Sequence, residues 1–394
     1  RFSSSSCCFR RLRSRWWQQR VSVSSCPSAS SPERKTVPSD RLQEHLTHVH
    51  FDERVTSADP VVQRLKTGIL AGQRAALASA ITLVESTHPT KRAQGNVLLG
   101  ELLREERRRF EEGGIQSLIF RVAISGSPGV GKSSFIEALG TELTERRGLK
   151  VAVLTIDPTS AVTGGSVLGD LTRMQELSRN PLAYIRQSPT CGFLGGVTRG
   201  IHEAVILCEG AGYNVVIIET VGVGQSEISV VDMCDMMCLL LSPAHGDELQ
   251  GVKRGIMEMS DLLVVTKDDG ELKAKAKMAQ AEYISALKYM RPRAPEWKPK
   301  VLRSSIKDAE SVSRVWAEMA EYWQTIGGSG TLLKRRSTQM HTCMWNHIRE
   351  EVMRYFSSHP RVSALSKEMD EAVRAGSLTP GIAAETLVRE FFRK

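Results

Sequence analysis

The sequence has no run of about 18 consecutive apolar residues, which is the length that a helix needs to cross a bilayer, so we expect no membrane span. Its eight cysteines form no C-x-x-C pair and no regular spacing, which excludes the disulfide framework of small secreted domains. Scattered cysteines in a chain of 394 residues are typical of a reducing compartment. Cys234 and Cys238 stand four residues apart, but their apolar run is typical of a buried strand, where such residues are far apart. We interpret both as core residues; a metal pair is the alternative.

Acidic residues are missing from the first 32 positions, which hold six arginines and no lysine. The net charge of the whole chain is +9, so the remainder carries only +3. Because the basic excess belongs to this segment, it does not indicate a nucleic-acid surface. A composition over residues 1–35 that is rich in Ser and Arg, and free of acidic residues until Glu33, is typical of a mitochondrial transit peptide, and it predicts the mitochondrial matrix. A generic basic tail is the alternative. The chain begins with Arg, and we expect its true start to lie upstream.

The remaining residues divide into segments with different periodicity. After a linker at 36–58, apolar residues at helical spacing predict an N-terminal helical subdomain at 59–113. Residues 114–327 alternate strand-like runs with amphipathic helices. Residues 328–394 are helical again and form a C-terminal dimerisation arm in our interpretation. An apolar stripe from Met340 to Phe356 repeats every four residues there, and it must pack on the same chain or on a second copy.

The central segment is expected to form an α/β domain. The predicted strands are 118–124, 150–156, 182–186, 214–219, 235–241, 261–266 and 300–303. Several of these runs are apolar on both faces, which favours a mostly parallel sheet with helices on both faces. In such sheets ligands bind at the carboxyl ends of the strands.

A phosphate-binding loop follows the first of these strands. The sequence from Gly126 to Ser134 has the form G-x-x-x-x-G-K-S, and a helix-like run follows it. This context predicts the P-loop NTPase fold, in which backbone N–H groups and a helix N-terminus bind phosphate. Lys132 would reach the β- and γ-phosphates, and the Ser133 hydroxyl would bind Mg²⁺. The expected nucleotide contacts are Gly126, Ser127, Pro128, Gly129, Val130, Gly131, Lys132, Ser133 and Ser134.

The base of the nucleotide is predicted from the end of the 261–266 strand. Thr266-Lys267-Asp268-Asp269 matches the [N/T]-K-x-D pattern that reads guanine. Asp269 would accept hydrogen bonds from N1–H and the exocyclic amine, and adenine offers neither donor there. Lys267 would lie along the base plane. After the last strand, Ser305, Ile306 and Lys307 are a second base contact, although Ile306 replaces the usual small residue.

A γ-phosphate sensor is predicted at the end of the 214–219 strand, where Glu219-Thr220-Val221-Gly222 has the form E-x-x-G. Glu219 would hold Mg²⁺, and the Gly222 N–H would contact the γ-phosphate and release it on hydrolysis. Val223 stands where many GTPases place a glutamine that orients water, and an apolar side chain cannot orient water. We therefore expect slow turnover that a partner accelerates.

Two further acids are candidate magnesium groups. Asp157 ends the strand beside the phosphate loop, and Asp170 closes a glycine-rich stretch. Asp170 can equally be the N-cap of a helix that starts at Leu171.

Long motifs carry a resemblance to a known family. The segments 157–160, 164–174, 219–227 and 246–255 closely resemble the methylmalonyl-CoA mutase-associated GTPases, from the metallochaperone branch of P-loop GTPases. The resemblance covers roughly residues 58–394. It implies GTP and GDP as ligands, a homodimer through the C-terminal helices, and a GTPase that chaperones methylmalonyl-CoA mutase. It also implies gating of adenosylcobalamin loading and protection or reactivation of the mutase, with the cobalamin adenosyltransferase as a further candidate partner.

The same resemblance assigns one more catalytic residue. Lys253 matches the lysine that swings toward the phosphates in this family and supplies the charge of an arginine finger; an exposed lysine at a helix start is the alternative. Two other functions stay open. One is a P-loop kinase or ATPase linked to amino-acid transport, for which we find no acceptor pocket with a base. The other is a nickel or cobalt metallochaperone, for which Cys191 and His202 are the nearest candidate ligands.

Overall fold

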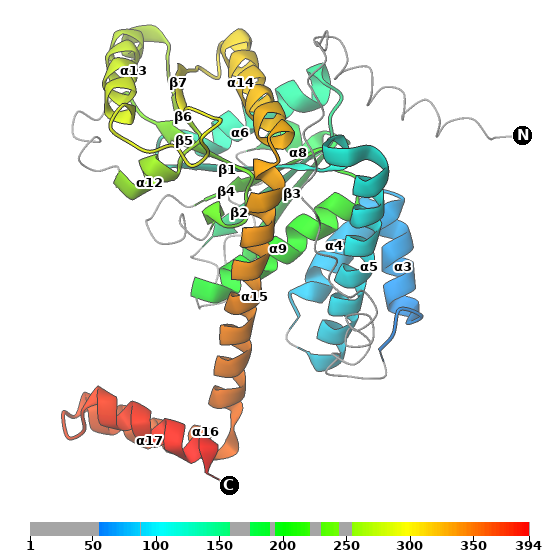
Figure 1. Ribbon diagram of the computed structural model, residues 1–394, viewed down its shortest axis with the longest axis vertical. Coiled ribbons are helices and arrows are strands. Elements are labelled where there is room, and N and C mark those ends of the chain that lie inside the picture. The colour runs from blue at the N-terminus through cyan, green and yellow to red at the C-terminus, as the bar shows by residue number, and fades with distance from the viewer. Residues whose placement is uncertain are drawn as a thin grey trace, which may run out of the picture. The chain divides into compact units, whose positions relative to one another are not determined.

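The computed structural model of the chain is shown in Figure 1. It describes residues 55–86, 88–157, 174–189, 194–220, 230–243 and 254–393. The expected leader at 1–35 lies outside these residues, as do Asp170, Gly222 and Lys253. Within the described ranges, none of the helices combines the length and apolar character that crossing a bilayer requires.

Seven strands form one sheet in which every neighbouring pair is parallel. The order across the sheet is β3-β2-β4-β1-β5-β6-β7. In chain order the strands are β1 Phe120–Gly126, β2 Val151–Asp157, β3 Ala183–Pro189, β4 Val215–Glu219, β5 Met236–Leu241, β6 Leu262–Val265 and β7 Lys300–Arg303. Each strand begins within two residues of the start of a predicted strand. Since all the pairs are parallel, the expectation of a parallel sheet is confirmed.

Helices connect and flank these strands. They are α3 Pro60–Leu70, α4 Arg74–Val84, α5 Pro89–Gly113, α6 Lys132–Thr141, α8 Gln175–Arg179, α9 Leu194–Gly210, α12 Arg254–Met259, α13 Lys273–Leu287, α14 Ala309–Gly328, α15 Thr331–Ser358, α16 Pro360–Arg374 and α17 Pro380–Phe392. Short turns of other helix types lie at η1 Gly114–Ser117, η2 Glu142–Arg146 and η3 Gly270–Leu272.

The helices cover both faces of the sheet. Side chains of α3, α4, α5 and α9 share a core with one face, to which Ala123 and Ile218 belong. The opposite face carries the alternate side chains, and Phe120 of β1 packs there against Trp316 and Trp323 of α14. All residues of β1, β4 and β5 are buried, as the apolar runs predicted. The expected α/β sheet with helices on both faces is thus confirmed.

Helix α15 is bound to the sheet through a buried aspartate. Asp235, just before β5, accepts from Arg336 Nε at 2.9 Å and from Arg336 Nη2 at 2.7 Å. Its carboxylate also accepts from the Arg121 backbone N at 2.9 Å, and its backbone oxygen accepts from Tyr322 Oη at 2.6 Å. Gln339 of the same helix donates from Nε2 to Cys234 O at 2.7 Å. Arg336 and Gln339 thus attach α15 to the segment just before β5. Cys234 and Cys238 are both fully buried, which agrees with core residues.

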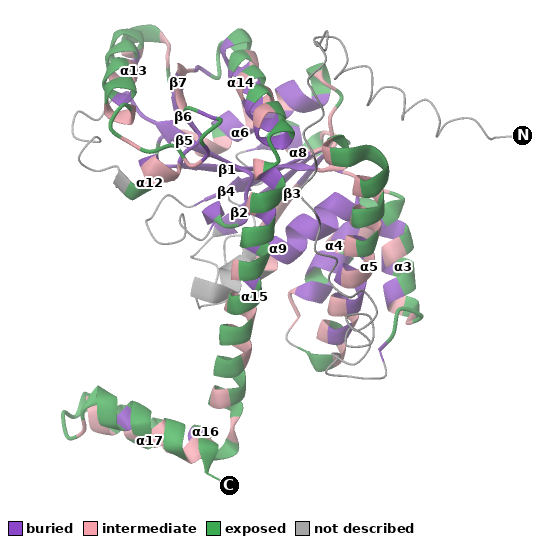
Figure 2. Ribbon diagram, in the orientation of Figure 1, coloured by how far each residue is buried: buried purple, intermediate pink, exposed green. Residues whose placement is uncertain are grey.

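Helix α15 begins with residues buried against the sheet, but most of the apolar stripe further along the helix is exposed (Figure 2). Met340, Met344, Ile348 and Val352 are exposed, between 40% and 55% of their surface. Phe356, at the end of the stripe, packs on Phe391 of α17 with ring centroids 5.4 Å apart. The first four side chains therefore present an apolar surface to solvent.

Candidate functional site

The parallel order places four predicted motifs at one edge of the sheet. Strands β4, β1, β5 and β6 are consecutive neighbours, and β7 follows β6. Their carboxyl ends carry Glu219, the loop from Gly126 to Ser134, the turn 266–269 and the turn 304–307. The chain thus brings residues about 180 positions apart to a single edge, where ligands of open α/β sheets bind.

The phosphate loop has the backbone that anion binding requires. It leaves β1 at Gly126 and enters α6 at Lys132, with Gly129 and Gly131 at φ 82° and 99°. A Cβ on Gly126 would lie 2.6 Å from Leu240 O of the neighbouring strand, so a side chain there has no space. Val130 is buried and anchors the loop from below. The N-terminus of α6 therefore opens directly onto the loop, which favours phosphate.

The lysine of the motif lies against its own loop. Lys132 Nζ donates to Gly126 O at 2.7 Å and to Ser127 O at 3.2 Å. These carbonyls hold the ammonium group beside the loop's backbone. An ammonium at this position can exchange carbonyl contacts for phosphate oxygens without leaving the loop.

A hydroxyl and a carboxylate meet beside the lysine. Ser133 Oγ lies 2.9 Å from Glu219 Oε1, and Glu219 is buried at the end of β4. Hard oxygen donors of this kind fit Mg²⁺, which prefers carboxylate and hydroxyl oxygens together with substrate phosphates. Asp157 ends β2, two residues beyond Thr155, which is the register partner of Glu219. The predicted metal residues Ser133 and Glu219 are in contact, and Asp157 stands on the adjacent strand; Asp170 is outside the described residues.

The turn after β6 is tied to the phosphate loop. Thr266 Oγ1 donates to Val130 O at 2.8 Å, and Lys267 Nζ donates to Gly129 O at 2.9 Å. Lys267 has φ 57° and is the one non-glycine residue with a positive φ among those described. The predicted guanine-reading turn and the predicted phosphate loop therefore form one connected structure.

Asp269 already holds hydrogen-bond donors. It accepts from Ser305 Oγ at 2.5 Å and from Lys307 Nζ at 3.0 Å. The Ser305 hydroxyl and, next, the Lys307 ammonium lower the pKa of Asp269 below its ordinary value, so its carboxylate is ionised and acceptor-only at neutral pH. Ser305 in turn receives support from α14, because its backbone N donates to Ser311 Oγ at 3.0 Å.

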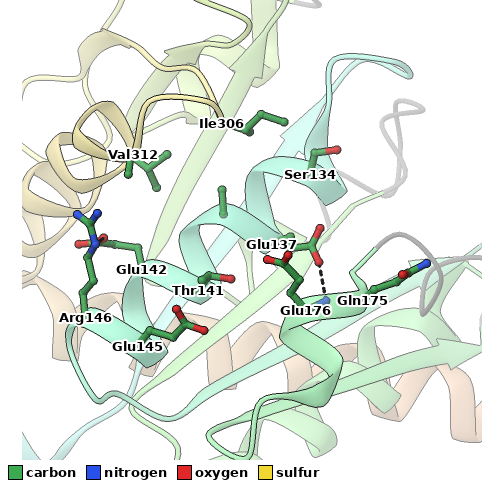
Figure 3. Close-up of a pocket in the computed structure, with 12 residues that line it drawn as sticks. Ser134, Glu137, Thr141, Glu142, Glu145, Arg146, Gln175, Glu176, Ile306 and Val312 are labelled. Atoms are coloured by element: carbon green, nitrogen blue, oxygen red, sulfur yellow. Dashed lines mark hydrogen bonds and ion pairs between the residues drawn. The ribbon is translucent and has the colours of Figure 1, made fainter.

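A cavity of about 620 Å³ lies beside this site, between α6, α8 and α14 (Figure 3). It includes Ser134 at its loop end and Ile306 at its base-reading end, so it adjoins both predicted motifs. Figure 3 shows Glu137 facing Glu176, where Glu137 Oε1 accepts from the Glu176 backbone N at 3.0 Å. Ile306, the residue that replaces the usual small one, lines this cavity and is half exposed.

The candidate ligands of a nickel or cobalt metallochaperone do not form a metal site in the part of the chain that the structure describes. Among the described residues, no group of three His, Cys, Asp or Glu side chains could hold a metal ion. His202 is buried in α9, and burial lowers its pKa to about 3, while Cys191 lies outside the described residues.

The sequence prediction missed Arg303, whose guanidinium contacts Asp268 inside the predicted base-reading turn. The position of Arg303 at the carboxyl end of a predicted strand was a signal, but the sequence did not identify Asp268 as its partner.

Comparison with known proteins identifies the family. A sequence model described as methylmalonyl Co-A mutase-associated GTPase MeaB matches residues 77–361. A Caenorhabditis elegans protein described as "Methylmalonic aciduria type A homolog, mitochondrial" is 69% identical over 376 residues, which is 94% of this chain and 94% of that protein. The Mus musculus protein of the same description is 52% identical over 330 residues, 84% of this chain and 79% of its own length.

A solved structure has a similar fold. The crystal structure titled "LAO/AO transport system kinase" has a TM-score of 0.63 and 32% identity, and the match covers 85% of this chain and 99% of that one. A probable GTPase of Mycobacterium tuberculosis is 44% identical over 330 residues, 84% of this chain and 95% of its own. The family model spans the sheet, the phosphate loop and the turn at 266–269. The chain belongs to the family of methylmalonyl-CoA mutase-associated GTPases, and it is a P-loop GTPase.

Proposed function

We propose that this GTPase is a chaperone of methylmalonyl-CoA mutase that gates adenosylcobalamin loading and protects or reactivates the mutase. The observation that carries the proposal is the family match over residues 77–361, because the description of that family names association with this mutase. The relatives from C. elegans and Mus musculus are named mitochondrial. We extend this location to the present chain and place it in the matrix, where the Ser-rich and Arg-rich leader at 1–35 would direct it.

In the proposed site, each residue has a definite task. Lys132 and the loop backbone bind the β- and γ-phosphates, while Lys267, Asp269 and the 305–307 turn bind guanine. Ser133 and Glu219 hold Mg²⁺, with Asp157 and Asp170 in support, and the metal would neutralise charge on the phosphate oxygens. Gly222 senses the γ-phosphate, and Lys253 supplies a further positive charge. The contacts of Ser133 with Glu219 and of Lys132 with its loop support these assignments.

The exposed stripe of α15 supports a homodimer in this proposal. Met340, Met344, Ile348 and Val352 form an apolar face on one helix, and a second copy would bury it. Residues 328–394 are then the dimerisation arm, 114–327 the GTPase domain and 59–113 the helical subdomain. The mutase is the proposed partner of the chain, and the cobalamin adenosyltransferase is a further candidate partner.

The base reader predicts a change of nucleotide specificity. Replacing Asp269 by asparagine should weaken GTP binding by about 10² or more, because the amide cannot accept from both the N1–H and the exocyclic amine of guanine. The same variant should gain affinity for XTP, whose C2 oxygen can accept from the new amide. Equilibrium binding of GTP, ATP and XTP to the purified full chain measures both effects. Lys275→Ala, at an exposed position of α13, is the control that should match wild type. Unchanged preference for GTP in Asp269→Asn would contradict the assignment.

If the mutase is the partner, it should change the rate of GTP hydrolysis by this chain. GTP hydrolysis by the isolated chain should be slow, because Val223 cannot orient water, and added methylmalonyl-CoA mutase should raise kcat by at least about tenfold. The measurement is phosphate release at saturating GTP, with and without mutase, and with another adenosylcobalamin enzyme as the control protein. Co-purification with mutase should differ between a non-hydrolysable GTP analogue and GDP. Absence of any complex in both nucleotide states, together with unchanged turnover, would sink the chaperone proposal.

The transport-linked kinase is the second candidate, and one title among the structural relatives names that role. We do not adopt it, because the relatives that are more similar in sequence carry no such description. A metallochaperone is not favoured either, since His202 is buried and neutral.

A further inference from the structure

A residue outside the [N/T]-K-x-D pattern contacts the turn that carries Asp269. Arg303 is the last residue of β7 and is the register partner of Val265, the last residue of β6. Its Nη1 donates to Asp268 Oδ1 at 3.0 Å. Asp268 lies directly between Lys267 and Asp269, so this ion pair attaches the middle of the turn to the neighbouring strand.

Arg303 is itself fixed before it reaches Asp268. Its Nε donates to Gln280 Oε1 at 2.9 Å, and Gln280 Nε2 donates to Val301 O at 2.7 Å. Gln280 belongs to α13, which lies beside β7 (Figure 1). The guanidinium is therefore oriented by a side chain that is bonded to the same strand, which reduces the freedom lost when Arg303 pairs with Asp268. Both partners are mostly buried, with side-chain exposures of 29% for Arg303 and 14% for Asp268.

The turn needs such support because its backbone is unfavourable. Lys267 has φ 57°, a conformation that residues with a Cβ avoid. Thr266 Oγ1 fixes the start of the turn on Val130 O, and the Asp268 backbone N donates to Ser304 O at 3.2 Å. The Arg303 pair is the side-chain contact that fixes the residue after Lys267. Strained backbone persists where surrounding contacts over-determine it.

We propose that Arg303 is a positioning residue for guanine recognition, which acts through Asp268 to hold Lys267 in its left-handed conformation and to aim Asp269 at the base. The inference rests on the proposed role of Asp269 as the base reader. Arg303 makes no contact with the nucleotide in this proposal. Its effect is to keep the carboxylate preorganised, so that guanine binds without first ordering the turn.

The consequence is a selective loss of guanine discrimination. GDP offers the exocyclic amine to Asp269, whereas inosine diphosphate (IDP) lacks it, so the ratio of the two dissociation constants reports how well the carboxylate is aimed. In Arg303→Ala the Kd of GDP should rise about 5- to 30-fold, while the Kd of IDP changes less and the ratio falls. The kcat at saturating GTP should stay within about twofold of wild type, because the hydrogen bonds of Arg303 go to Gln280 and Asp268, and Thr266 still ties the turn to the phosphate loop.

The experiment is isothermal titration of GDP and IDP into the purified full chain and its variants. Arg303→Lys keeps a cation near Asp268 and should recover part of the ratio. Asp268→Asn removes the charge at constant shape and should lower the ratio even if Arg303→Ala folds poorly. Lys300→Ala is the matched control on the same strand, since Lys300 pairs with Glu321 of α14 at 3.2 Å, away from the turn. It should keep the wild-type ratio.

The outcomes separate this inference from the assignment of the site. A wild-type ratio in Arg303→Ala and Asp268→Asn, with a lowered ratio in Asp269→Asn, would overturn the role of Arg303 alone. A wild-type ratio in Asp269→Asn would instead reject the base reader itself. A role in folding only would lower the melting temperature of Arg303→Ala and leave its ratio unchanged, which also counts against the proposal.

Discussion

Replacing Asp235 by alanine should lower the free energy of unfolding by about 3–5 kcal/mol, the largest stability effect that we expect in this chain. Asp235 is fully buried, and its carboxylate pairs with Arg336 at 2.7 Å and accepts from the Arg121 backbone N at 2.9 Å. The alanine variant leaves a buried N–H without this acceptor, and it leaves the Arg336 guanidinium with only the more distant carboxylates of Glu209 at 3.6 Å and Glu106 at 3.8 Å. Removing one partner of a buried pair costs more than the pair contributes, because the remaining charge loses its hydrogen-bonded carboxylate. The midpoint of urea unfolding, followed by far-UV circular dichroism at pH 7, measures the change.

A surface ion pair of similar geometry provides the control. Asp370 pairs with Arg374 at 2.8 Å on α16, and both side chains are mostly exposed. Exposed pairs contribute little, because water and salt screen them, so Asp370→Ala should unfold at the same midpoint as wild type. If the two variants unfold together, the network around Asp235 does not anchor α15 in the way that we describe.

Replacing Lys132 by alanine should reduce kcat for GTP hydrolysis by about 10²–10³. In the structure its ammonium lies against the carbonyls of Gly126 and Ser127, at the inner side of the phosphate loop. A positive charge fixed there can stabilise the negative charge that develops on the phosphoryl oxygens, and alanine provides none. Phosphate release at saturating GTP, in the presence of Mg²⁺ and of the mutase, measures the loss.

Two controls make this result specific. Lys275→Ala removes a lysine from an exposed position of α13 and should keep wild-type turnover. A melting curve of Lys132→Ala should overlap that of wild type, which shows that the fold survives. Turnover in Lys132→Ala within threefold of wild type would remove Lys132 from the list of catalytic residues.

Much of the fold could be read from the sequence, because its strands are short apolar runs that are buried on both faces. The run Val215-Val216-Ile217-Ile218 predicted β4 for this reason, and every one of its residues is buried. The phosphate loop was equally clear, since its glycines and lysine have fixed spacing between a strand and a helix. Register and strand order were not predictable, because they depend on which apolar faces meet in three dimensions.

Some residues of the candidate site could likewise be predicted from the sequence, and others could not. Sequence spacing pointed to Lys132, Ser133, Glu219 and Asp269, because each belongs to a short motif whose chemistry depends on neighbouring residues. Arg303 could not be assigned in advance, since its partner Asp268 is 35 positions away and is reached only because β6 and β7 are adjacent.

By itself, the sequence determined the fold class, the phosphate loop and the nucleotide, because these follow from local pattern and from residue chemistry at fixed spacing. Tertiary structure alone decided three things: that Ser133 lies 2.9 Å from Glu219, that Asp235 is enclosed by residues of α14 and α15, and that Arg303 pairs with Asp268. Each joins segments that are distant in the chain. Such contacts depend on how the sheet is ordered and packed, which residue spacing does not encode.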